Sequence, residues 1–107
     1  MPKAILAQAF GSGASQNATS LIIQKGAFSS LIARADNTTE SLIVAILLQA
    51  SQKMLPADRD ANPDGEVAVE LGLQTTVARG GSEYTQDMFI VTVQKPKVTN
   101  HINPNDY

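Results

Sequence analysis

The alternation of apolar and polar side chains from Glu66 to Val77 constrains the fold more than any other feature of the sequence. The apolar side chains on one face would be Val67, Val69, Leu71, Leu73 and Val77. The polar side chains on the opposite face would be Glu66, Glu70, Gln74 and Thr76. Because a period of two is typical of a strand with one buried face, we predict a half-buried β-strand here.

A second apolar run, Met88–Val93, follows the glycine-rich link ARGGSEYTQ. Two such runs joined by glycines predict a β-hairpin. Pro96 would end the pairing, since proline has no N–H to donate. The first half of the chain repeats the pattern less cleanly, with short apolar runs at 4–10, 20–25 and 27–34, a tight turn or bulge at Gly26, and a turn at ADNTTE.

The most apolar stretch, SLIVAILLQASQKML at 41–55, fits two structures. As a helix it would begin near Thr39 and stop at Pro56, with Lys53 in its last turn. As a strand it would place alternate residues from Leu42 to Ala50 on one apolar face. A helix would have to bury apolar side chains all around its first two turns, so we favour the strand.

Five or six short strands predict an all-β fold, either an antiparallel sandwich or a small barrel. If residues 40–55 are helical, the alternative is an α+β fold. The 107 residues suit one domain, 1–107, with a β core over about 20–95. The segment 11–20 has no large apolar residue and 96–107 is polar, so we expect both to be arms or linkers, 96–107 being the C-terminal arm.

The segment DANPDG resembles a calcium loop, because Asp60, Asn62 and Asp64 alternate before Gly65 as in the first half of an EF-hand loop. The closing bidentate glutamate should follow at the twelfth position, but Leu71 stands there and continues the apolar face of the strand. We therefore interpret the segment as a turn and assign no metal ligand. A weak, incomplete calcium site at these three side chains is the alternative.

The sequence contains few residues that could carry out catalysis. The chain has no Cys, and its one histidine, His101, lies in the polar tail. Glu66 and Glu70 share a strand face that we expect to be solvated, unlike the concave site of a glycosidase. GSGAS at 11–15 lacks the Lys-Ser/Thr that follows a phosphate loop. We predict a protein that is not an enzyme, with no catalytic or cofactor-binding residue.

Charge and hydropathy exclude further classes. The net charge is −2 and the eight Lys and Arg are scattered singly, so we expect no nucleic-acid partner. The apolar run near the N-terminus is too short for a secretory signal, and no segment reaches a membrane span. These features predict no signal peptide, no transmembrane segment and no membrane partner.

What remains is binding or assembly, and two features favour assembly. The strands are rich in Ala, Ser, Thr, Asn and Gln, so few charges block pairing with another chain. Polar ends can also order on a neighbouring subunit.

In this overall character the chain is similar to the small decoration, or cement, proteins of tailed-phage capsids, and nearly as similar to tail or fibre components. The resemblance implies a β-rich, often trimeric domain that stabilises a shell through its arms. It also implies self-association, a capsid or tail protein as partner and a place in the virion. The alternative is a small cellular, cytoplasmic β domain that binds a small molecule or calcium.

Overall fold

The computed structural model describes residues 5–60, 66–95 and 101–107, apart from the side chain of Asp58. In chain order the elements are α1 (Leu6–Phe10), β1 (Ser15–Gln16), β2 (Leu21–Ile22), the 3-10 helix η1 (Lys25–Ala27), α2 (Thr39–Lys53), α3 (Pro56–Asp60), β3 (Val67–Leu71), β4 (Thr75–Arg79), β5 (Ser82–Gln86), β6 (Phe89–Val93) and η2 (Pro104–Asp106). The strands pair antiparallel as β1–β2, β3–β6 and β4–β5. The described residues thus combine one long helix with small antiparallel sheets, and they close neither a barrel nor a sandwich.

The stretch after ADNTTE is a helix, so the preferred strand at 40–55 was wrong and the helical alternative is confirmed. Thr38 caps α2, since its Oγ1 accepts a hydrogen bond of 3.1 Å from the amide of Ser41. Glu40 in the first turn and Lys53 in the last turn both suit the helix dipole. The strand was preferred on the assumption that a helix must bury every apolar side chain. Here it does not, because Ile43 and Val44 remain 51% and 45% exposed.

Replacing Thr38 by Ala should lower the free energy of unfolding by about 1 kcal/mol, because the substitution leaves the amide of Ser41 without its acceptor. Urea denaturation followed by circular dichroism measures this loss. Thr39→Ala is the matched control, since Thr39 is the first helical residue and alanine has the higher helix propensity. Equal losses in the two variants would contradict the assignment of Thr38 as the cap.

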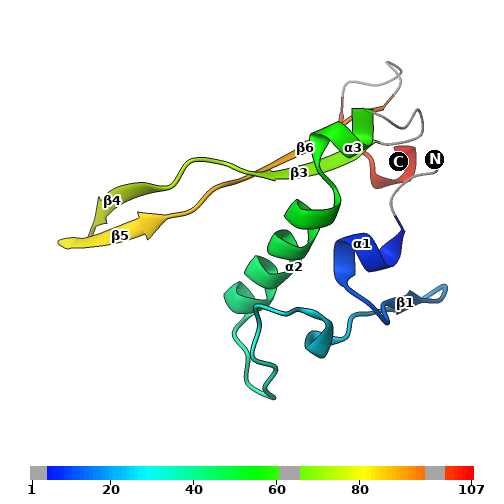
Figure 1. Cartoon of the computed structure of the whole chain (residues 1–107), viewed down its shortest axis with the longest axis horizontal. Coiled ribbons are helices and arrows are strands. Elements are labelled where there is room, and N and C mark those ends of the chain that lie inside the picture. Colours follow the sequence, from blue (N-terminus) through cyan, green and yellow to red (C-terminus); the bar gives the residue numbers. More distant parts are fainter. Residues whose placement is uncertain (1–4, 61–65, 96–100) are drawn as a thin grey trace.

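The predicted hairpin is confirmed, although it is longer and its turn shorter than expected. β3 and β4 run outward, and β5 and β6 return beside them (Figure 1). Arg79 pairs with Ser82, so only Gly80 and Gly81 form the turn. Both glycines have positive φ, +59° and +82°, as a type I′ turn requires. The predicted link ARGGSEYTQ is therefore mostly strand.

One extra residue interrupts the hairpin between its base and its tip. Leu71 pairs with Phe89 and Thr75 with Gln86, so three residues of the first strand face two of the second. The amide of Gly72 still donates to the Met88 carbonyl at 2.8 Å, which leaves Leu73 as a β-bulge.

Because of the bulge, the predicted apolar face of the first strand does not extend to Val77. Relative to the second strand, the extra residue moves Val77 to the side opposite that of Val67, Val69 and Leu71. The predicted apolar face therefore holds only as far as Leu71.

The first half departs furthest from prediction. The run at 4–10 contains helix α1, which lies beside α2 (Figure 1) with Gln49 Nε2 3.5 Å from the Ala7 carbonyl. The run at 27–34 forms no strand after Ala27, and Gly26 lies within η1. The expected linker 11–20 carries β1 and part of the turn to β2, in which Asn17 Oδ1 accepts from the amides of Thr19 and Ser20 at 2.9 Å.

The core is small and has two parts, one where α2 faces the segment after η1 and one where the end of α2 meets the base of the hairpin. The buried apolar residues among those described are Phe28, Ala45, Ala50, Ala68 and Val69. The amide of Val69 donates to the Met54 carbonyl at 2.7 Å, which ties β3 to the end of α2. Arg59 of α3 reaches across β3 to β6, where Nη1 lies 2.6 Å from Thr92 Oγ1.

Candidate functional site

The candidate calcium loop lies mostly outside the described residues, which omit 61–65 and thus Asn62 and Asp64. Asp60, its first position, is the last residue of α3, and its Oδ1 lies 3.1 Å from Arg59 Nε. An arginine beside this carboxylate competes with a cation for the same oxygen. Within 5–60, 66–95 and 101–107, no three His, Cys, Asp or Glu side chains are grouped as metal ligands would be.

The other candidate residues for catalysis or binding do not form a common site. His101 is exposed, and its carbonyl accepts a 2.8 Å hydrogen bond from Lys95 Nζ. Glu66 and Glu70 are half-buried on either side of Ala68, which is 1% exposed, so the prediction of a solvated face was wrong. GSGAS begins with Gly11, the C-cap of α1, and opens no helix, unlike a phosphate loop.

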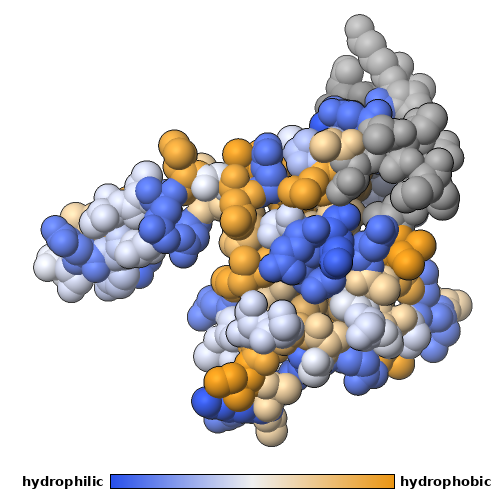
Figure 2. All heavy atoms as spheres, viewed as in Figure 1, coloured by the Kyte–Doolittle hydropathy of each residue, from blue (hydrophilic) through white to orange (hydrophobic). Residues whose placement is uncertain are grey.

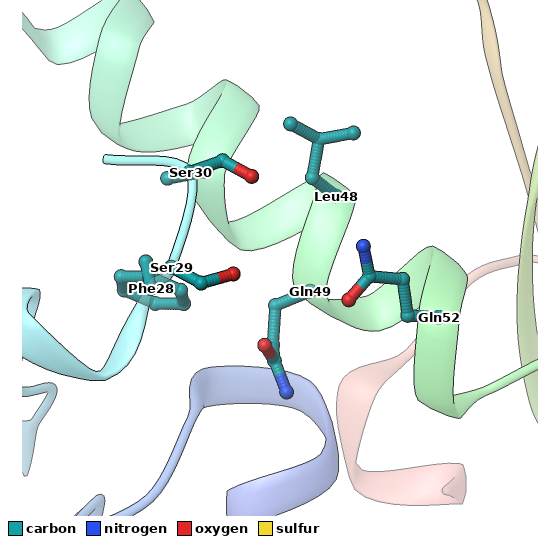
Figure 3. A pocket seen from close by; sticks show the side chains of 7 residues that line it. Phe28, Ser29, Ser30, Leu48, Gln49 and Gln52 are labelled. Atoms are coloured by element: carbon teal, nitrogen blue, oxygen red, sulfur yellow. The ribbon is translucent and has the colours of Figure 1, made fainter.

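A shallow hollow lies between α2 and the segment after η1. Leu48, Gln49 and Gln52 line it from α2, and Phe28, Ser29 and Ser30 face them (Figure 3). Its cavity volume is about 10 Å³. That is room for about one water molecule, whereas small-molecule sites span roughly 300–1,000 Å³.

The most unusual feature of the surface is its apolar content. The large apolar or aromatic residues of the hairpin that are at least two-fifths exposed are Leu71, Leu73, Tyr84, Met88, Ile90, Val91 and Val93. Figure 2 shows this apolar surface over the base of the hairpin and along α2, while the far end of the hairpin is hydrophilic. Exposed apolar side chains that gather in this way are typical of interaction sites in soluble proteins.

The ladder of β3 and β6 determines which backbone groups point away from the pair. The amide of Gln94 donates to the Glu66 carbonyl at 2.7 Å, and the amide of Gly72 to Met88 at 2.8 Å. Hydrogen-bonded and non-bonded pairs alternate along an antiparallel ladder. The pairs made by residues 67, 69 and 71 of β3 are therefore the non-bonded ones, whose N–H and C=O groups point outward.

On β6 these outward groups belong to Phe89, Val91 and Val93. On β3 the equivalent amide of Val69 bonds the Met54 carbonyl, whereas on β6 no described residue bonds the outward groups. With respect to the residues that the structure describes, β6 thus has a free edge about 17 Å long. No charged residue lies between Asp87 and Lys95, so the usual protection of an edge strand is missing along β6.

The outward-facing residues Phe89, Val91 and Val93 were not singled out from the sequence. The absence of charge from Met88 to Gln94 was visible in the sequence. Which residues of the run point outward was not, because that depends on the pairing register with β3.

The last seven residues are held close to the end of β6. Lys95 Nζ lies 2.8 Å from Asp106 Oδ2 and 5.8 Å from the centre of the Tyr107 ring. Residues 101–107 of the predicted C-terminal arm therefore fold back on the strand that precedes them. The element that projects from the body is instead the β4–β5 end of the hairpin (Figure 1).

Comparison of the chain with protein-family models, with curated proteins and with solved structures found no match. In the described part of the chain, no helix has both the length and the apolar character needed to cross a membrane.

Proposed function

We propose that this chain is a non-enzymatic structural subunit that associates with copies of itself and with a larger protein assembly. The observation that carries the proposal is the free, uncharged edge of β6, with Val91 half exposed at its centre. The exposed apolar residues of α2 add to this edge, so the isolated chain leaves much apolar surface in contact with water.

The exposed area supports an interface of substantial size. The chain exposes 7903 Å², against about 5,700 Å² for a compact monomer of its mass. The chain is therefore more open than a compact monomer of this mass, and that openness leaves room for a standard interface, to which each partner contributes ~800 Å².

The partner we propose is a virion protein, because the chain is similar in overall character to the cement proteins of tailed phages. In this proposal the subunit sits on a capsid or tail, as a trimer or another homo-oligomer. Strands added from neighbouring copies would complete the sandwich or barrel that the described residues do not close alone.

Light scattering of the purified protein should give a mass that is a multiple of 11.3 kDa. The melting temperature should rise by about 5 °C for each tenfold rise in protein concentration, because association stabilises the folded state by mass action. Co-expression with the proteins encoded beside it should yield a complex with a capsid or tail protein.

A monodisperse monomer whose melting temperature ignores concentration, and which binds no capsid or tail protein, would contradict the proposal. A bound small molecule in native mass spectrometry, or heat from a calcium titration that disappears in the Asp60→Ala variant, would favour the cellular binding domain instead.

A further inference from the structure

We propose that two copies of this chain associate through β6, strand against strand, about a two-fold axis that passes beside Val91. The inference rests on the proposed function, since it names the partner and the edge through which self-association occurs. The resulting sheet would have four strands in the order β3–β6–β6–β3. Such pairing satisfies the outward N–H and C=O groups of both edges at once.

The positions of the outward groups restrict the register. Only odd-numbered residues of β6 point outward, so an antiparallel partner must place odd residues opposite odd residues. A two-fold axis at Val91 meets this condition. It pairs Val91 with itself and Phe89 with Val93 of the second copy.

Charge selects this register among those that fit. With the axis at Val91, Asp87 stands opposite Lys95 of the second copy, and the reciprocal pair forms at the other end. An axis at residue 90 would place Asp87 opposite Val93, and an axis at residue 92 would place it opposite Lys97, beyond Pro96, where a proline ends strand pairing. Opposite charges facing each other across strands stabilise pairing, and all positions between them are uncharged. Within its own chain the ammonium group of Lys95 already lies 2.8 Å from Asp106 Oδ2. Asp87 of the second copy would therefore be an additional carboxylate beside this ammonium group.

The hairpin is built so that this edge stays regular. The bulge at Leu73 lies in the first strand, so β6 keeps an uninterrupted alternation from Phe89 to Val93. Val91 and Val93 are 50% and 42% exposed, so apolar area is present on the edge for a second copy to cover. The outer edge of β3 is not equivalent, because the Met54 carbonyl already accepts a hydrogen bond from the Val69 amide there.

The chain has no cysteine, so a single introduced cysteine reports on self-contact without background. In the proposed register the two Val91 Cα atoms lie about 5.5 Å apart as a hydrogen-bonded pair, whose Cβ atoms stand farther apart than a relaxed disulfide needs. Val91→Cys should therefore form a covalent dimer with a short bifunctional thiol-reactive reagent that spans one interstrand distance. Val93→Cys is the matched control: it lies on the same edge with similar exposure, but its two copies would be about 13 Å apart.

A second variant tests the backbone bonds directly. Val91→Pro removes an N–H that β3 does not use, so the hairpin should persist while two intermolecular hydrogen bonds are lost. We expect roughly 10- to 100-fold weaker self-association by analytical ultracentrifugation. Leu73→Lys is its control, because Leu73 is 75% exposed on the same hairpin but lies away from the edge.

Efficient crosslinking of Val91→Cys but not Val93→Cys, with weakening by Val91→Pro alone, would support the proposal. An oligomer in which the two cysteine variants crosslink alike, or in which Val91→Pro leaves association unchanged, would overturn the β6 pairing and leave the proposed assembly function standing. A chain that is monomeric at every concentration and has no capsid or tail partner would overturn both.

Discussion

Replacing Gly11 by Ala should lower the free energy of unfolding by about 2–5 kcal/mol, for two reasons that add. Gly11 has φ +87° and ψ 167°, a region of backbone conformation that only glycine adopts without strain. It is also buried, and an added Cβ would lie 2.8 Å from Ala27 Cβ. The substitution would force α1 away from η1, and the loss is a large share of the ~5–15 kcal/mol that stabilises a typical domain.

Urea denaturation at one fixed protein concentration measures this loss. Gly26→Ala is the matched control: Gly26 lies in η1 and has nothing within 4 Å of an added Cβ. It should be neutral or stabilise by up to about 1 kcal/mol, because alanine reduces the freedom of the unfolded chain. A Gly11→Ala variant as stable as Gly26→Ala would mean that α1 and η1 do not pack as described.

The hairpin could be predicted from the sequence because its determinants are local. Alternation from Glu66 onward and the Gly80-Gly81 pair specify two strands and a tight turn without reference to the rest of the chain. The bulge could not be predicted from the apolar pattern, since Leu73 continues the alternation of Leu71. The available signal was Gly72, which allows Met88 Cβ to approach within 2.9 Å of where a Cβ would stand.

The long helix was predicted only as the alternative, for a different physical reason. Thr38, Glu40 and Lys53 carry the start and stop signals of α2, and all three are local. They were outweighed by the expectation that a chain buries its own apolar side chains. Ile43 and Val44 show that this expectation fails here. When apolar residues occur on every side of a segment, capping residues are then the better guide to its structure.

The candidate interface could be predicted only in part. That β6 lacks charges follows from the sequence alone, and so does its β propensity. The position of β6 at the edge of its sheet could not be predicted from the sequence, because residues 41–55 could have formed a neighbouring strand. Their folding as α2 is what leaves β6 with β3 as its one partner in the described sheets.

Replacing Val69 by Asp should lower the free energy of unfolding by about 3–5 kcal/mol, since it places a charged carboxylate at a buried apolar position. Val69 is 4% exposed at the point where the hairpin meets α2. Its amide donates to the Met54 carbonyl, so a charge here would also separate β3 from the end of the helix. Amide hydrogen exchange at residue 69 should become much faster as this contact opens.

Leu71→Asp provides the matched control, because Leu71 lies two residues further along the same strand and face but is 63% exposed. It should cost less than about 1 kcal/mol in urea denaturation, as expected for a surface substitution. A similar loss in both variants would show that the base of the hairpin is not anchored at Val69. The contrast between them tests whether this small junction supports the projecting hairpin, on which the proposed β6 interface depends.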